Sequence, residues 1–192
     1  MQVKILEKQR LLSGFFDVDV AMVQFEKFDG GFSAPVKRYN LLRGEAVAAL
    51  IYLQDVKRLV LIRQFRYADY AHRCQGWIEE IVAGVIDEGE SPLECIRRET
   101  IEETGYEVNE FQHIASVYST PGITTERVHI YLGIANSSDL KHSGGGLDVE
   151  HEDIQLLEWT TEEAKDKLMQ GKLEDAKTIL AMQYFFLQGV HG

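Results

Sequence analysis

Three glutamates near the middle of the chain are spaced so that they could hold a metal ion together. Glu99, Glu102 and Glu103 stand at positions i, i+3 and i+4, which places them on one face of a helix. Like charges at such positions destabilise an exposed helix by roughly 0.2–0.5 kcal/mol per pair. A divalent cation removes that repulsion, and Mg²⁺ prefers oxygen ligands that it shares with phosphates. The alternative is a solvated acidic face that pairs with Arg97 and Arg98.

The helix that would carry these glutamates is predicted from the residues at its ends. Ser91 is a favourable N-cap, Pro92 suits the first helical position, and Glu94 completes a capping box. Gly105 is well placed to end the helix in a left-handed turn. The sequence therefore predicts a helix between Ser91 and Gly105.

Fixed offsets around this helix resemble a known motif. Gly84 is followed after five residues by Glu90, and after seven more by the run RETIEETGY at residues 98–106. This pattern resembles the Nudix box, GX5EX7REUXEEXGU with U an apolar residue, over its whole length. Thr100 departs at the first apolar position and Tyr106 departs mildly at the last, but no charged position is lost. The resemblance identifies the chain as a Nudix hydrolase, a family that cleaves nucleoside diphosphates linked to another group.

The resemblance also implies roles for the motif residues. A divalent ion, Mg²⁺ or alternatively Mn²⁺, would be bound by one backbone carbonyl and by carboxylates, namely Ala83, Glu99 and Glu103, with Glu152 and Glu102 assisting. Glu102 is also counted among the catalytic residues. The rest of the motif would be structural and tie the loop to its helix: Gly84, Glu90, Arg98 and Gly105.

The general base is expected in the loop LDVEHEDI, residues 147–154. The loop resembles that of the ADP-ribose pyrophosphatase branch, in which one glutamate is the base and a second, two residues on, ligates metal. By that resemblance Glu150 is the base and Glu152 the ligand; a solvated acidic loop is the alternative. His151 is the second candidate for the base, since a free histidine has a pKa of about 6.5. The preceding run Gly144–Gly146 lacks the Lys-Ser/Thr pair of a phosphate-binding loop and is interpreted as a mobile loop.

The resemblance to the ADP-ribose pyrophosphatases covers nearly the whole chain, through GFFDVDV, VKRYNLLRG, RQFR and TPG with a following glutamate. It implies stacking of the base on Phe15 or Phe16, and further substrate contacts from Arg38, Arg43, Arg66, Val85, Thr120, Pro121, Gly122 and Glu126. The products would be AMP and ribose 5-phosphate. GDP-mannose pyrophosphatases share much of this scaffold and provide the alternative substrate. A non-hydrolytic sensor of nucleotide sugars is a further alternative, although such modules usually lose box carboxylates.

The predicted fold class is α/β, the family's α/β/α sandwich around a mixed sheet. Residues 1–45 are expected to form an N-terminal antiparallel β-hairpin or sheet extension, and residues 46–192 the hydrolase domain. The resemblance to the ADP-ribose pyrophosphatase branch implies that this extension serves dimerisation and substrate contacts. Residues 69–79 are interpreted as a polar connection. Residues 175–188 are predicted to form a helix that packs on the core.

Composition narrows the class of protein further. The formal net charge of −11 argues against a nucleic-acid binder that works through phosphate contacts. No apolar run approaches the ~20 residues of a membrane span, and the first residues lack the pattern of a signal peptide. Cys74 and Cys95 form no metal or CxxC pattern, and a reducing cytoplasm fits best. By the resemblance to the family, the expected partners are a small nucleotide sugar and a second copy of the chain; neither nucleic acid nor a membrane is expected.

Overall fold

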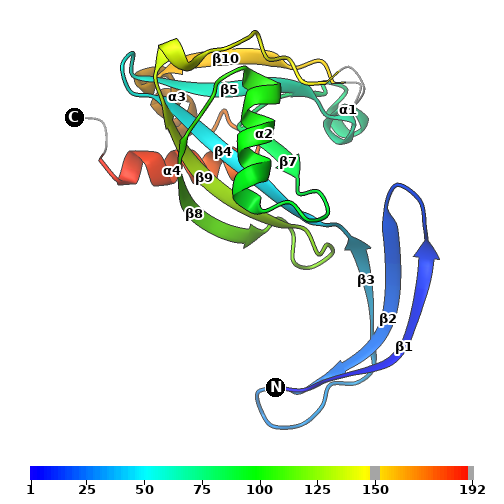
Figure 1. Cartoon of the computed structure of the whole chain (residues 1–192). Coiled ribbons are helices and arrows are strands. Elements are labelled where there is room, and N and C mark those ends of the chain that lie inside the picture. The colour runs from blue at the N-terminus through cyan, green and yellow to red at the C-terminus, as the bar shows by residue number, and fades with distance from the viewer. Residues whose placement is uncertain (148–151, 190–192) are drawn as a thin grey trace. The chain divides into compact units, whose positions relative to one another are not determined.

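The computed structural model describes residues 1–147 and 152–189, and the chain divides into two compact units (Figure 1). The first unit comprises residues 1–45 together with residues 118–127. The second comprises residues 46–117 and the chain from Val128 onward. In these described ranges, no helix combines the length and the apolarity that a bilayer crossing requires.

The first unit is a three-stranded antiparallel sheet. Its strands β1 (Val3–Leu12), β2 (Asp17–Phe25) and β3 (Val36–Leu42) follow one another in the sheet in that order. Gly30, in the turn between β2 and β3, has a φ of +84°, which glycine adopts without strain. The predicted extension is confirmed, but β1 was not foreseen as a separate strand. Every residue of β1 is exposed, so the strand lacks the alternation of apolar and polar residues that marks a half-buried strand.

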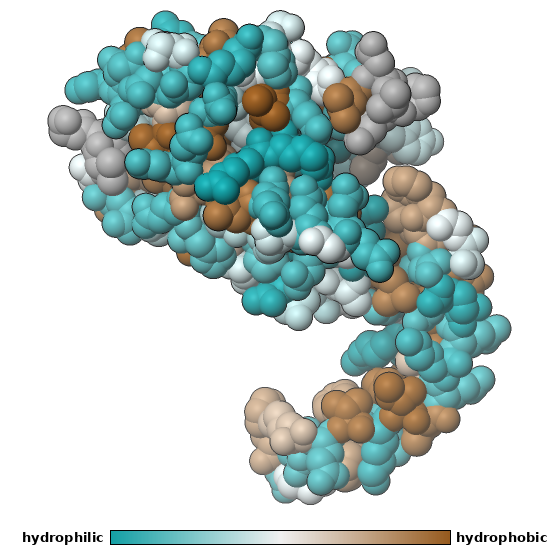
Figure 2. All heavy atoms as spheres, in the orientation of Figure 1, coloured by the Kyte–Doolittle hydropathy of each residue, from teal (hydrophilic) through white to brown (hydrophobic). Residues whose placement is uncertain are grey.

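Apolar side chains lie on the surface of this first unit, as Figure 2 shows. They include, among the more exposed large hydrophobic residues of the chain, Val3, Ile5, Leu6, Leu11, Leu12, Phe25 and Phe28. The sheet therefore has no buried core of its own comparable with that of the second unit.

The second unit contains a seven-stranded mixed sheet. The main path is β10-β5-β4-β9-β8, while β6 pairs with β5 and β7 pairs with β4. The strands are β4 (Glu45–Leu53), β5 (Arg58–Phe65), β6 (Trp77–Glu80), β7 (Val82–Val85), β8 (Glu110–Tyr118), β9 (Arg127–Ala135) and β10 (Gln155–Thr160). The helices are α1 (Tyr67–Arg73), α2 (Pro92–Thr104), α3 (Thr161–Met169) and α4 (Ala176–Leu187), with a 3-10 turn η1 (Ser137–Asp139).

Helices cover both faces of this sheet. Alternate residues of β4 point to opposite faces, and both sets are apolar, so each face needs a covering layer. Ile51 belongs to the same buried cluster as Ile96 of α2. Its neighbour Leu50 belongs to the other cluster, which contains Phe185 of α4. In Figure 1, α2 lies on the near face of the sheet and α3 and α4 lie behind it. The predicted α/β/α sandwich is confirmed.

The polar connection predicted for residues 69–79 is wrong. Residues 67–73 form α1, and Trp77 begins β6, where it pairs with Phe65 of β5. Helix α1 buries none of its seven residues, so its sequence carries no amphipathic pattern. Strand β6 has only four residues, too few for a clear period of two.

Candidate active site

Helix α2 begins and ends as its sequence predicts. The Ser91 hydroxyl accepts a hydrogen bond from the Glu94 amide (3.3 Å), and the Glu94 carboxylate accepts one from the Ser91 amide (2.9 Å). Gly105 closes the helix with a φ of +76°. These caps fix the start of the helix, and with it the direction in which the three box glutamates point.

Glu90 and Arg98 join the loop before α2 to the helix itself. Arg98 donates from Nε and from Nη2 to the two carboxylate oxygens of Glu90, each at 3.0 Å. The Asp87 amide adds a bond to the same carboxylate at 3.2 Å. The Arg98 guanidinium holds the pKa of Glu90 down at about 2. Glu90 is thus a carboxylate whose charge is already neutralised by the protein.

Glu99 lies closely against the strand that leads into the box. Arg98 donates from Nη1 to Glu99 (2.9 Å) and to Glu102 (3.1 Å). Burial outweighs this contact and raises the pKa of Glu99 to about 7. A Cβ atom on Gly84 would lie 1.9 Å from a carboxylate oxygen of Glu99. Only glycine at position 84 therefore allows the Glu99 side chain to occupy this place.

Glu103 is the most buried carboxylate of the group, with 2% of its surface exposed. The Ala83 amide donates to it at 3.2 Å, but burial and the nearby charge of Glu99 raise its pKa well above the usual value. Glu152 adds to the negative potential at both residues, and its own carboxylate accepts a bond from Gln64 at 3.3 Å. Ala83, Glu99, Glu103 and Glu152 therefore share one electrostatic environment.

This donor set fits a hard divalent cation. Buried carboxylates that raise one another's pKa repel each other when both are ionised, and a cation bound between them offsets this repulsion. In residues 1–147 and 152–189, no three His, Cys, Asp or Glu side chains form a metal site by themselves. Mg²⁺ commonly binds through one or two carboxylates together with substrate phosphates, so a complete side-chain cage is not needed. Glu150 and His151, the candidates for the base, lie outside the described residues.

The glycine run after β9 closes the C-terminal end of α2. The Gly145 amide donates to the carbonyl of Glu103 (2.9 Å), and the Gly146 amide donates to the carbonyl of Glu102 (3.2 Å). A Cβ atom on Gly144 would lie 2.4 Å from the carbonyl oxygen of Glu103. The interpretation as a mobile loop missed this contact, which holds the chain leading to Glu152 beside the box helix.

Part of the predicted substrate group gathers in the first unit. The guanidinium carbon of Arg43 lies 5.1 Å from the centre of the Phe16 ring, and its Nε lies 3.7 Å from a carboxylate oxygen of Glu126. The Phe15 ring, which is 91% exposed, lies 4.7 Å from that of Phe16. The side chain of Thr125 fixes the Arg43 backbone through two hydrogen bonds of 2.8 Å. Phe16, Arg43 and Glu126 thus form one cluster.

Other predicted contacts of this unit are placed differently. The Thr120 carbonyl accepts hydrogen bonds from the amides of the third and fourth residues after it, each at 3.1 Å, so Thr120, Pro121 and Gly122 form a tight turn. Arg38 pairs with Ala21 across β3 and β2, and its guanidinium donates to the neighbouring Lys37 carbonyl at 3.3 Å. In the described part of the chain, Arg38 makes no bond to the Arg43 cluster.

Arg66 and Val85 belong to the second unit. Arg66 donates from Nε to Glu80 at 2.6 Å, and Lys177 donates to the other oxygen of Glu80 at 2.5 Å. The Val85 carbonyl accepts a bond from the Cys95 thiol at 3.4 Å. Sequence reasoning did not single out Glu80 or Lys177. The available signal was a glutamate directly before the apolar run IVA, because a buried carboxylate needs a cationic partner.

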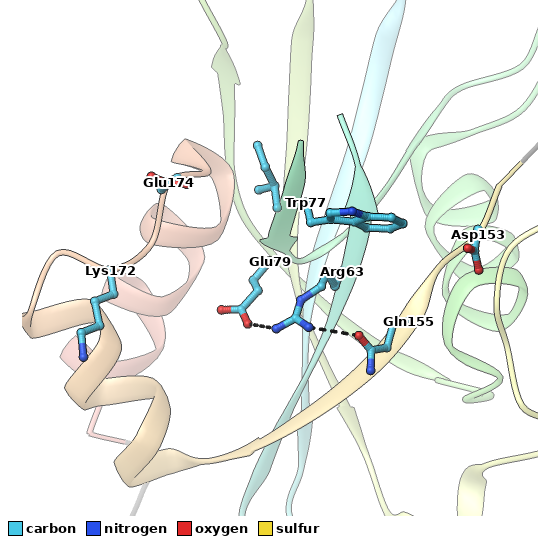
Figure 3. A pocket seen from close by; sticks show the side chains of 8 residues that line it. Arg63, Trp77, Glu79, Asp153, Gln155, Lys172 and Glu174 are labelled. Atoms are coloured by element: carbon cyan, nitrogen blue, oxygen red, sulfur yellow. Dashed lines mark hydrogen bonds and ion pairs between the residues drawn. The ribbon is translucent and has the colours of Figure 1, made fainter. Parts of the chain in front are cut away.

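A cavity of about 550 Å³ opens in the second unit (Figure 3). Arg63 lies in it and donates to Glu79 (2.6 Å) and to Gln155 (3.2 Å). None of the residues predicted for the active site lines the cavity, whose wall is formed by Arg63, Trp77, Ile78, Glu79, Asp153, Gln155, Lys172 and Glu174.

Comparisons with known proteins show which proteins the chain is similar to. A model of the NUDIX domain matches residues 42–181. A GDP-mannose pyrophosphatase of Cronobacter sakazakii is 41% identical over 155 residues, which cover 80% of each chain. One from Pectobacterium atrosepticum is 34% identical over 189 residues, covering 97% of this chain and 95% of the relative. A crystal structure of an ADP compounds hydrolase has the same fold, with a TM-score of 0.74 at 21% identity over 100% of this chain and 98% of the other.

Proposed function

The chain belongs to the Nudix hydrolase family, and from this premise we propose that it hydrolyses the pyrophosphate bond of a nucleoside diphosphate sugar. The observation that carries the proposal is the pair of buried carboxylates, Glu99 and Glu103, against the strand that contains Ala83. Burial and the neighbouring carboxylates raise the pKa of both residues, and a cation bound between them would favour their charged forms. A bound Mg²⁺ or Mn²⁺ would supply that charge, neutralise phosphate oxygens and acidify a water molecule.

The residues then divide into those that hold the metal and those that move the proton. Glu99, Glu103 and the Ala83 carbonyl are the proposed metal ligands, with Glu152 and Glu102 assisting. Water adds to one phosphorus, the P–O–P link breaks, and the products are a nucleoside monophosphate and a sugar phosphate. Glu150 is the proposed base that takes the proton of this water, a role that typically contributes about 10²–10⁴-fold.

GDP-mannose is the substrate that we propose first, giving GMP and mannose 1-phosphate. The relatives named GDP-mannose pyrophosphatase favour it, because their similarity extends over up to 97% of this chain. ADP-ribose, which the sequence motifs place first, becomes the second candidate. In either case Phe16, Arg43 and Glu126 are proposed substrate contacts, because they form one cluster in the first unit.

A second copy of the chain is the proposed partner of the first unit. Strand β1 lies at the edge of its sheet and exposes apolar side chains such as Val3 and Ile5. An unpaired apolar edge strand favours association with another chain. Both cysteines are free thiols, which supports the proposed cytoplasmic location. Light scattering tests the homodimer, and a monomeric mass would contradict it.

The decisive experiment is turnover of GDP-mannose, ADP-ribose and other nucleoside diphosphate sugars with and without Mg²⁺, with the products separated by chromatography. We expect GMP to form from GDP-mannose only when metal is present. AMP from ADP-ribose at a higher rate would reverse the order of the two substrates. Tight binding without turnover would contradict hydrolysis and favour a nucleotide-sugar sensor.

A further inference from the structure

Two neighbouring glutamates of β6 each bind one arginine and one lysine. Glu79 accepts from Arg63 (2.6 Å) and Lys167 (2.6 Å), and Glu80 accepts from Arg66 (2.6 Å) and Lys177 (2.5 Å). We call these sets the Glu79 group and the Glu80 group. Because successive strand residues point in opposite directions, the two carboxylates leave β6 differently, and α3 and α4 each bring a lysine to one of them.

The two groups differ in the burial of the glutamate and in the guanidinium nitrogens that the arginine uses for hydrogen bonds. The Glu80 side chain is 3% exposed, whereas that of Glu79 is 22% exposed. Arg63 uses both Nη1 and Nη2, for Gln155 and Glu79. Arg66 binds Glu80 through Nε, and within the described residues its Nη1 and Nη2 donate to no other group. Since the Arg66 side chain is 41% exposed, its outer edge can reach an anion.

Helix α4 fixes the second oxygen of Glu80. Lys177 stands in the first turn of α4, where a positive charge is unfavourable for the helix dipole. Its ammonium group bonds both Glu80 and Asp175, the N-cap of α4, the latter at 2.8 Å. Thr178 attaches the same turn to the strand region, because its hydroxyl accepts a bond of 2.9 Å from the Ile81 amide. The contact with Glu80 explains why a lysine occupies this position.

We propose that Glu80, held by Lys177, is a positioning residue that orients the Arg66 guanidinium toward the pyrophosphate of the substrate. The proposal rests on the proposed function, which supplies the pyrophosphate. With both carboxylate oxygens of Glu80 bonded, the guanidinium is held by Nε in one orientation. An arginine that is already oriented loses less conformational freedom when the anion binds.

A double-mutant cycle on Arg66 and Lys177 tests this coupling. The probe is inorganic pyrophosphate with Mg²⁺, measured by calorimetry, so that the result does not depend on hydrolysis. Lys177→Met alone is expected to weaken pyrophosphate binding by at least about tenfold. In an Arg66→Met background the same substitution should cause no additional loss, because Lys177 acts through Arg66. Lys177→Arg should restore most of the affinity. Thermal unfolding of each variant shows whether the fold is intact.

Lys167→Met is the matched control, since it removes the corresponding lysine from the Glu79 group and should leave pyrophosphate affinity unchanged. Equal losses in Lys167→Met and Lys177→Met would overturn the proposal, as would additive losses in the cycle. Failure of the wild-type protein to bind pyrophosphate would overturn it as well. Binding with an intact cycle but no turnover of any nucleotide sugar would instead contradict only the proposed hydrolysis.

Discussion

Glu90 and Glu103 belong to the same short motif and stand in opposite electrostatic environments. Glu90 receives a bidentate guanidinium, and its pKa is held at about 2. Glu103 is buried beside Glu99 with one backbone amide as its donor, and its pKa is raised. A carboxylate paired with an arginine, such as Glu90, can stabilise the fold of the loop. A buried carboxylate whose hydrogen-bond donor is a backbone amide, such as Glu103, is suited to bind a metal. The difference separates the structural from the chemical part of the motif.

Removing the carboxylate of Glu103 should have the largest effect on turnover. We expect Glu103→Gln to lower kcat by about 10³-fold, which corresponds to about 4 kcal/mol of transition-state stabilisation. Without metal, the free energy of unfolding of the Glu103→Gln variant should not fall, because a buried charge is removed. Steady-state kinetics and denaturant unfolding measure the two effects. Activity within tenfold of the wild type would show that Glu103 is no metal ligand.

Displacing Glu99 without changing it should have the next largest effect. A methyl group at position 84 would overlap the Glu99 carboxylate, so Gly84→Ala must shift that side chain. We expect kcat to fall by about 10²-fold, as misplacement of a catalytic group by about 1 Å can cause. Gly31→Ala is the control, since a Cβ atom built there would lie no closer than 3.4 Å to another side chain. Full activity of Gly84→Ala would mean that the site tolerates another position of Glu99.

Breaking the Glu90–Arg98 pair should affect stability more than chemistry. Glu90→Gln is expected to lower the free energy of unfolding by about 1–2 kcal/mol at neutral pH, after allowance for solvent screening. The folded pKa of about 2 lies below the usual 4.5, so this contribution is fully present above pH 4.5 and is lost as the pH falls toward 2. Urea unfolding of both proteins between about pH 6 and about pH 3 measures the difference. A difference that does not shrink with acid would contradict the pairing.

Thr100→Val should have the smallest effect. Thr100 is buried on α2, and its hydroxyl donates to the Ile96 carbonyl four residues earlier at 2.6 Å. Valine has nearly the same shape and matches the apolar position of the motif, so stability should change by less than about 1 kcal/mol. Turnover should be unchanged, because the residue lies outside the group of carboxylates. A large loss of activity would extend the chemical part of the motif to this position.

Sequence alone predicted the features that depend on near neighbours. The capping contacts of α2 join residues that lie close together in the sequence, so Ser91, Glu94 and Gly105 were identified with their roles. Contacts between distant residues were missed. Lys177 meets Glu80 across 97 positions, and the glycine run meets carbonyls of α2 that precede it by some 40 positions. Strand β1 was missed because it is exposed along its whole length.

The most direct test of the division within the motif is calorimetric titration of Mn²⁺ into the wild-type protein, Glu103→Gln and Glu90→Gln. We predict that Glu103→Gln weakens Mn²⁺ binding by at least about tenfold, while folded Glu90→Gln binds nearly as the wild type does. Equal weakening in both variants, or unchanged binding in Glu103→Gln, would contradict the assignment of Glu103 to the metal and Glu90 to the structure.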